Sequence, residues 1–291
     1  MCGAQLLKFV DTTGGKIATQ SFGSTENPAV VLIMGATASM LGWPDALCAA
    51  LASRGLFVIR FDHRDTGRST SLPPGEADYA VEDMADDVLA IMDSYGIGQA
   101  TLMGMSLGGY IAQMLALEHP ARVRSLILVS SEPLGWDGPA LPHISQTFLD
   151  HFGNLSTLDW GDRDAVIAFL LGIDKLSSGS AQPFDEAGAR ARIEEMLDRT
   201  DSPASMFNHA TLSVRKDWTG RFRDIACPVL VVHGEEDPVL PIENGRAIAV
   251  GIKGAELFVM SGVGHELPGS QLQAIAERAA GHIHRFAEMT R

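Results

Sequence analysis

Cysteine is scarce in this chain of 291 residues, which has only Cys2, Cys48 and Cys227. The three form no C-x-x-C pair and no even-numbered set, so a zinc ribbon and a disulfide framework are both excluded. Such cysteine usage is typical of reduced thiols. We therefore expect a cytoplasmic protein.

Long apolar runs and a cationic leader are missing as well. No stretch offers the roughly 18 uninterrupted apolar residues of a membrane-spanning helix. The opening MCGAQLLKFVDTTGG lacks the cationic and apolar segments of a signal peptide. We expect a protein that is not exported and has no membrane partner.

Basic residues are also few. Lys and Arg number 22 against 36 Asp and Glu, the formal net charge is -14, and no basic cluster occurs. A phosphate backbone would be repelled, so we expect no nucleic-acid partner. The remaining composition, 46% hydrophobic and 20% charged residues, is that of a globular protein and excludes disordered and coiled-coil chains.

Short apolar runs alternate with longer helical patterns along the chain. Runs this short and rich in Val, Ile and Leu are typical of parallel strands that are covered on both faces. The predicted strands are Ala29–Met34, Leu56–Phe61, Ala100–Met103, Ser125–Val129, Val229–Val232 and Glu256–Met260. A hairpin at the sheet edge is predicted from Gln5–Val10 and Lys16–Gly23, which flank a Thr-Gly-Gly turn.

The helical pattern is clearest over Val81–Tyr95, where apolar residues share one face and Glu82, Asp83, Asp86 and Asp93 point elsewhere. Alternating strands and helices specify an α/β fold with a mostly parallel sheet and helices on its faces. The other predicted sheet-covering helices are Trp43–Ser53, Leu107–Leu117, Ile242–Val250 and Gln271–Phe286.

One long stretch, 134–223, holds helical patterns and no convincing buried strand. Its predicted helices are Ser145–Phe152, Asp164–Leu171 and Asp185–Arg199. We interpret it as a helical cap inserted between residues 1–133 and 224–291, which form the two parts of the core. A cap in this place would lie over the carboxyl ends of the strands, where open α/β sheets bind ligands.

A candidate nucleophile follows the third predicted parallel strand. Residues 104–109 read GMSLGG, a G-x-S-x-G pattern between a strand and a helix. This context predicts a strained turn with Ser106 at its tip, where Gly104 and Gly108 let strand and helix approach.

A serine hydroxyl needs an imidazole to take its proton and a carboxylate to orient that imidazole. Asp237 follows the strand Val229–Val232, and His265 follows the strand Glu256–Met260. Their order and placement predict a Ser106, Asp237 and His265 triad. Glu235, Glu236 and the more distant Glu132 stay open as alternative acids.

Two backbone N–H groups are expected to stabilise the oxyanion of such a site. Leu107, directly after the serine, supplies one. The loop that begins Met34-Gly35-Ala36 supplies the other, for which we favour Ala36 over an ordinary strand-to-helix turn. Met34, Gly35 and Met105 are expected to shape an apolar pocket near the serine.

These residues together resemble the α/β-hydrolase superfamily over essentially the whole chain. Met34-Gly35, LGWPD at 41–45 and VIRFDHRDTGRST at 58–70 resemble the aclacinomycin methylesterase group of bacterial esterases. The resemblance implies an eight-stranded, mostly parallel sheet with an inserted helical cap. It also implies that Ala36 and Leu107 are the oxyanion donors.

The resemblance has limits. Many superfamily members carry His-Gly where this chain has Met34-Gly35, and the cap shows no match that would transfer a polyketide methyl-ester substrate. We interpret Asp62–Thr70 as structural, with His63 or Arg64 lining the site as the alternative.

The sequence therefore predicts a serine carboxylesterase for a small or medium apolar ester, with no metal and no organic cofactor. His282 and His284 are two residues apart on a predicted helix and do not share a face, so they form no metal pair. The alternatives are lactone opening, C–C bond hydrolysis or perhydrolysis on the same fold, and a ligand receptor without turnover. A dinucleotide-binding loop is disfavoured because Ser106 replaces the middle glycine. The oligomeric state stays open, with a homo-oligomer possible.

Overall fold

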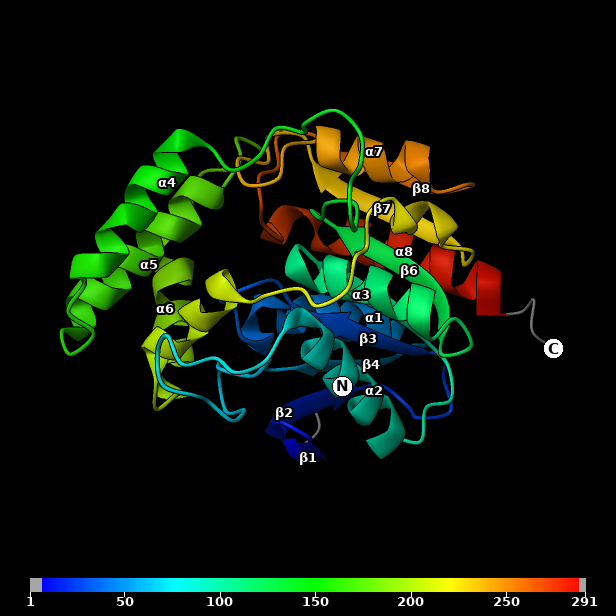
Figure 1. The fold of residues 1–291 in the computed structure, drawn as a ribbon, viewed down its shortest axis with the longest axis horizontal. Coiled ribbons are helices and arrows are strands. Elements are labelled where there is room, and N and C mark those ends of the chain that lie inside the picture. Colours follow the sequence, from blue (N-terminus) through cyan, green and yellow to red (C-terminus); the bar gives the residue numbers. More distant parts are fainter. Residues whose placement is uncertain (1–6, 288–291) are drawn as a thin grey trace.

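The fold is built on one eight-stranded sheet, seen in a computed structural model that describes residues 7–287 (Figure 1). The strand order is β1-β2-β4-β3-β5-β6-β7-β8; β1–β2 and β2–β4 pair antiparallel, and every other pair is parallel. The strands are β1 (Lys8–Thr12), β2 (Gly15–Phe22), β3 (Ala29–Ile33), β4 (Phe57–Phe61), β5 (Ala100–Met105), β6 (Val123–Val129), β7 (Val229–Gly234) and β8 (Glu256–Met260).

The predicted strands are all present within a few residues of their expected bounds. The β1–β2 hairpin lies at one edge, as expected, although Gln5 and Leu6 lie outside the described residues. One expectation was wrong: β8 is not covered on both faces, since Glu256 is exposed and Val259 is 37% exposed. β8 is the other edge strand, where neighbouring elements cover less of its surface.

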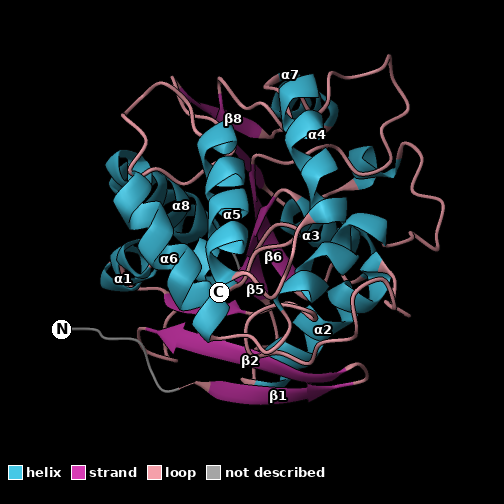
Figure 2. Cartoon of the chain, turned by 90° about the vertical axis from the view of Figure 1, so that its left-hand side faces the viewer, coloured by secondary structure: helices cyan, strands magenta, loops and turns pink. Residues whose placement is uncertain are grey.

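Five helices cover the two faces of the sheet. Apolar residues of α1 and α8 share one hydrophobic core with one face, and those of α2, α3 and α7 share a second core with the other face. Figure 2 shows α1 and α8 on one side of the strands and α2 and α3 on the other. The helices are α1 (Asp45–Ser53), α2 (Val81–Ser94), α3 (Leu107–Glu118), α7 (Glu243–Gly251) and α8 (Leu272–Ala287).

Helix α2 corrects one detail of the predicted polar face. Glu82 was expected to point away from the core, but its side chain is buried and accepts hydrogen bonds from the backbone N–H groups of Arg215 and Lys216. A buried carboxylate is tolerated because these donors replace its water. The helical period of α2 could not show that Arg215, 133 residues later in the chain, would cover this position.

A helical lobe, residues 146–211, lies between β6 and β7 in the chain and projects beyond one end of the sheet (Figure 1). It has its own apolar core, in which Ile167, Phe169 and Ile193 are buried. Leu134 and Trp218, outside the lobe but within the predicted cap, pack in the core of the sheet instead. The elements of the lobe are α4 (Gln146–Phe152), η2 (Gly153–Thr157), α5 (Arg163–Ser177), α6 (Glu186–Asp198) and η3 (Pro203–Thr211).

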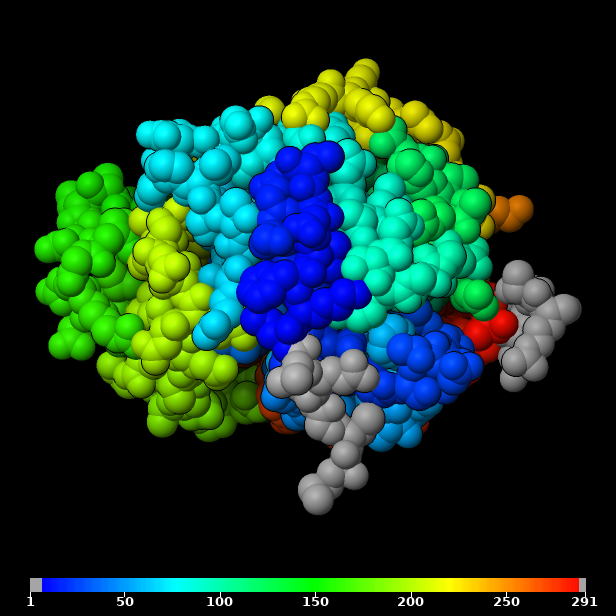
Figure 3. Space-filling view, turned by 90° about the horizontal axis from the view of Figure 1, so that it is seen from below, coloured from blue at the N-terminus to red at the C-terminus, as the bar shows by residue number. Residues whose placement is uncertain are grey.

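The lobe contacts the long loop that follows β4. Asn208 Nδ2 donates to Asp65 Oδ2 over 2.9 Å, and Arg199 pairs with buried Asp62 over 2.7 Å. The space-filling view shows the lobe, coloured green to yellow, next to this cyan loop (Figure 3). Three short 3-10 turns complete the described chain: η1 (Met40–Gly42), η4 (Arg221–Asp224) and η5 (Gly269–Gln271).

No helix within residues 7–287 has both the length and the apolar character needed to cross a membrane.

Candidate active site

Ser106 lies at the tip of a sharp turn between β5 and α3. Its φ of 51° is in the left-handed region that side-chain-bearing residues rarely adopt. Gly104 and Gly108 are both required, because other parts of the backbone approach them too closely to leave room for a side chain. A Cβ on Gly104 would lie 2.2 Å from the carbonyl oxygen of Gly108, and one on Gly108 would lie 2.0 Å from that of Ile33.

The turn is held by hydrogen bonds on both sides of its strained residue. Ser106 N–H donates to the Val129 carbonyl over 2.9 Å, and the Ser131 hydroxyl donates to the Ser106 carbonyl over 3.0 Å. Neighbouring β6 and the residues after it therefore fix the conformation that the chain would not adopt alone.

Asp237 and His265 are brought together from the ends of β7 and β8. Asp237 Oδ2 lies 2.7 Å from His265 Nδ1, and Asp237 Oδ1 accepts the backbone N–H groups of Val239 and Leu240. Because a carboxylate only accepts, His265 Nδ1 is assigned as the donor, which leaves Nε2 free to accept a proton.

Asp237 stays ionised in a buried position. Burial raises its pKa, but the opposing charge of His265 and the hydrogen bonds from His265 and Leu240 prevail, so the pKa of Asp237 lies below its usual value. A carboxylate held in this way can stabilise a neighbouring imidazolium.

None of the alternative acids contacts His265. The carboxylate of Glu235 accepts a hydrogen bond from the Ser261 hydroxyl, and that of Glu236 accepts one from the Ser180 hydroxyl. Glu132 Oε2 lies 3.5 Å from His143 Nε2.

Sequence reasoning missed a second histidine at Asp237. His233 is buried, its Nε2 lies 2.7 Å from the Leu240 carbonyl and 3.7 Å from Asp237 Oδ2. Burial lowers the pKa of His233, an effect that its hydrogen bond with the Leu240 carbonyl and the charge of Asp237 oppose. Its position inside the strand β7 gave no signal that distinguishes it from a core residue.

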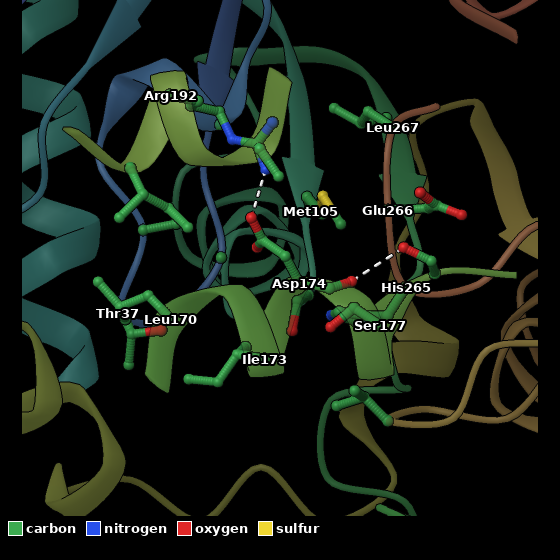
Figure 4. Close-up of a pocket in the computed structure, with 18 of the residues that line it drawn as sticks. Thr37, Met105, Leu170, Ile173, Asp174, Ser177, Arg192, His265, Glu266 and Leu267 are labelled. Carbon is green, nitrogen blue, oxygen red and sulfur yellow. Dashed lines mark hydrogen bonds and ion pairs between the residues drawn. The ribbon is translucent and has the colours of Figure 1, made fainter. Parts of the chain in front are cut away.

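Ser106 and His265 line one cavity of about 550 Å³ between the sheet and the lobe (Figure 4). That volume suits a drug-sized molecule. Met34, Gly35 and Met105 also line the cavity. Within the described residues, Ser106 Oγ makes no hydrogen bond to His265, a contact that is often long before a substrate binds.

The predicted oxyanion donors lie on two segments beside Ser106. A Cβ on Gly35 would lie 3.2 Å from the Ser106 Cβ, so the loop after β3 packs directly against the serine. Neither Ala36 N–H nor Leu107 N–H donates within residues 7–287, and Leu107 begins α3, whose N-terminus favours negative charge.

Two buried histidines hold the loop that contains Ala36. His63 Nε2 lies 2.9 Å from the Met34 carbonyl, and Thr37 N–H donates to His209 Nδ1 over 3.0 Å. His209 Nε2, which must then carry the proton, lies 2.8 Å from the Arg64 carbonyl. Neither His63 nor Arg64 lines the cavity. The role of His209 was not foreseen, because the lobe gave no alignable pattern.

The segment 62–70 is tied to its surroundings through its charged side chains, in keeping with the structural interpretation. Asp62 accepts the N–H groups of Met40 and Arg68. Arg64 forms a buried ion pair with Asp87 at 2.6 Å.

In the described part of the chain, no three His, Cys, Asp or Glu side chains gather as a metal site requires. The expectation of no metal and no cofactor stays a prediction.

Comparison with known proteins agrees with this geometry. The family profile described as "alpha/beta hydrolase fold" matches residues 28–269. The chain belongs to the α/β-hydrolase fold family. The chain is 30% identical to rhodomycin D methylesterase DauP of Streptomyces sp. (strain C5), over 91% of this chain and 93% of that protein.

This α/β-hydrolase also resembles proteins with other names. It is 29% identical to a 2-hydroxy-6-oxononadienedioate/2-hydroxy-6-oxononatrienedioate hydrolase of Burkholderia vietnamiensis, over 83% of this chain and 82% of that protein. The solved esterase EaEST of Exiguobacterium antarcticum superposes with a TM-score of 0.79 at 22% identity, covering 96% of this chain and 100% of that one. At this identity the structural likeness shows the fold alone.

Proposed function

We propose that this α/β-hydrolase cleaves a carboxylic ester through Ser106, His265 and Asp237. The observation that carries the proposal is one cavity lined by both the strained serine and the histidine whose Nδ1 is bonded to buried Asp237. The similarity to a methylesterase supports an ester as the substrate.

The mechanism is a two-step acyl transfer. Ser106 Oγ attacks the ester carbonyl while His265 Nε2 takes its proton, and Asp237 stabilises the resulting imidazolium. The N–H groups of Ala36 and Leu107 bind the oxyanion. His265 then protonates the leaving alkoxide and activates the water that hydrolyses the acyl-enzyme.

The cavity supports a small or medium substrate with an apolar acyl or alcohol part, because Met34, Met105 and the apolar residues of the lobe form much of its wall. We propose that residues 134–223 form the cap of the enzyme and that the protein acts in the cytoplasm. Its partner is the small-molecule ester, and a homo-oligomer is compatible with the fold.

Hydrolysis of a C–C bond is the second candidate, favoured by the similarity to the oxononadienedioate hydrolase. A panel of purified ester, lactone and vinylogous diketone substrates separates the two. Ester turnover that exceeds diketone turnover supports the esterase.

The test compares the wild type, Ser106→Ala and the control Ser156→Ala on p-nitrophenyl esters of increasing acyl length. Ser156 is an exposed serine of the lobe whose hydroxyl donates a hydrogen bond to the Gly153 carbonyl. Loss of the nucleophile should lower kcat at least about a thousand-fold, with the fold intact by circular dichroism. The control should keep its turnover. Unchanged turnover in Ser106→Ala overturns the proposal, and tight ligand binding by a wild type without turnover supports a receptor.

A further inference from the structure

The cavity above Ser106 carries an ion pair on the wall formed by the lobe. Asp174 of α5 and Arg192 of α6 both line the cavity, and Arg192 Nη2 donates to Asp174 Oδ2 over 2.5 Å (Figure 4). The Arg192 side chain is 46% exposed and that of Asp174 is 30% exposed. The pair is therefore accessible from the cavity although its neighbours are mostly apolar.

Both partners retain free hydrogen-bonding groups. Within residues 7–287, Asp174 Oδ1 accepts no hydrogen bond, and the remaining N–H groups of the Arg192 guanidinium make none. Burial raises the pKa of Asp174, which its contact with Arg192 opposes. An acceptor and a donor side by side match a hydroxyl, which can both donate and accept, or a carbonyl, which can accept from Arg192.

The charge around the pair disfavours an anionic ligand. Among the described residues, and apart from His265, the ionisable side chains that line the cavity are three carboxylates, Asp174, Asp185 and Glu266, and the guanidinium of Arg192. The charge of Arg192 is already balanced by Asp174. A carboxylate on the substrate would lose its hydration in the cavity and find no unpaired cation to replace it. The cavity should therefore bind esters that carry a carboxylate poorly.

The pair lies near the proposed chemistry. The Ser177 carbonyl accepts the backbone N–H of His265 over 2.7 Å. Asp174 precedes Ser177 by three residues, which is about 4.5 Å along the axis of α5. An ester whose carbonyl is held at Ser106 lies in the same cavity as the pair.

We propose that Asp174 and Arg192 form a polar subsite that selects apolar esters bearing an uncharged hydroxyl or carbonyl group and rejects esters bearing a carboxylate. This inference rests on the proposed esterase activity and names the class of ester that it acts on.

The test uses two matched ester series with six-carbon chains that end in methyl, hydroxyl or carboxylate. One series varies the acyl part, as p-nitrophenyl hexanoate, 6-hydroxyhexanoate and adipate monoester. The other varies the alcohol part, as acetates of hexanol, hexane-1,6-diol and 6-hydroxyhexanoate. In at least one series the wild type should have a kcat/KM for the hydroxyl ester that is about threefold to tenfold higher than for the methyl ester. Its kcat/KM for the hydroxyl ester should exceed that for the carboxylate ester by more than about tenfold.

Asp174→Asn removes the negative partner with little change in shape. The unbalanced Arg192 should then raise kcat/KM for the carboxylate ester about tenfold relative to the hydroxyl ester. Arg192→Gln should abolish the preference for hydroxyl over methyl. The matched control is Asp198→Asn, because Asp198 pairs with Arg163 at 2.7 Å and so also joins α6 to α5, but neither residue lines the cavity. The control should keep the ratios of the wild type.

The outcomes separate the subsite from the catalytic proposal. The affinities of the same esters are also compared by calorimetry on the Ser106→Ala variant, because this measurement requires no turnover. Ratios unchanged by Asp174→Asn, or equally changed by Asp198→Asn, overturn the subsite even when Ser106 is shown to be the nucleophile. A wild type that favours the carboxylate ester overturns it as well. Changed affinities in a protein without turnover support the subsite while the esterase proposal fails.

Discussion

His63 illustrates what burial does to a single titratable side chain in this molecule. The residue is 1% exposed. Burial lowers its pKa to about 3, and the nearby His209 acts in the same direction. The hydrogen bond with the Met34 carbonyl raises the pKa, but this effect is weaker. An unfolded histidine titrates near 6.5. Between about pH 6.5 and 3, only the unfolded chain binds this proton, so the free energy of unfolding falls as pH falls.

His63→Gln should therefore flatten the acid dependence of stability. Between pH 7.5 and 5.0 this one histidine accounts for a loss of about 2 kcal/mol in the wild type, and the variant should lose about that much less. Urea unfolding of both proteins at the two pH values measures the difference. His143→Gln is the control, since the His143 side chain is 58% exposed, and it should lose as much as the wild type. If His63→Gln and the wild type lose the same free energy of unfolding between pH 7.5 and 5.0, the buried imidazole of His63 does not determine the acid dependence of stability in this range.

The loop after β3 depends on contacts from two distant parts of the chain. His63, just after β4, contacts the Met34 carbonyl, and His209, in η3, accepts the N–H of Thr37. Thr37 has a φ of 63°, which is strained for a side-chain-bearing residue. The N–H of Ala36, the proposed oxyanion donor, lies between the two attachment points.

His209→Ala should consequently lower kcat about tenfold with little change in KM, because the loop would no longer hold Ala36 N–H where the oxyanion forms. Binding of a trifluoromethyl ketone, which mimics that oxyanion, should weaken in parallel. Asn208→Ala is the matched control: Asn208 also joins η3 to the core, through Gly75 and Asp65, but does not touch Thr37. It should lower the melting temperature and keep kcat. Equal losses of kcat in both variants would contradict a specific positioning role.

The sequence was most informative where local pattern decides structure. The strands and sheet-covering helices follow from apolar runs and helical periodicity, and G-x-S-x-G between β5 and α3 predicted the strained turn because only glycine fits at 104 and 108. Contacts between distant segments left no such trace. Burial of Glu82 by the segment at 215–218, attachment of Thr37 to His209, and the pairing of Asp174 with Arg192 all depend on tertiary packing.

Considered as a whole, the molecule joins its lobe to the loops that carry the acid and the histidine. The Ser177 carbonyl accepts His265 N–H, Gly179 N–H donates to Glu266 over 2.8 Å, and Ser180 is bonded to Glu236. The end of α5 and the residues after it thus contact the loops after β7 and β8. The lobe supplies the wall of the cavity and also supports the backbone of the proposed base.

Covalent labelling with a fluorophosphonate probe tests whether Ser106 is the nucleophile, because the probe reacts with a serine that an imidazole activates. Intact mass and peptide mapping should show one adduct, on Ser106, that is absent from Ser106→Ala and strongly slowed in His265→Ala. An adduct on another residue, labelling that persists in Ser106→Ala, or no labelling of the folded wild type would show that Ser106 is not an activated nucleophile.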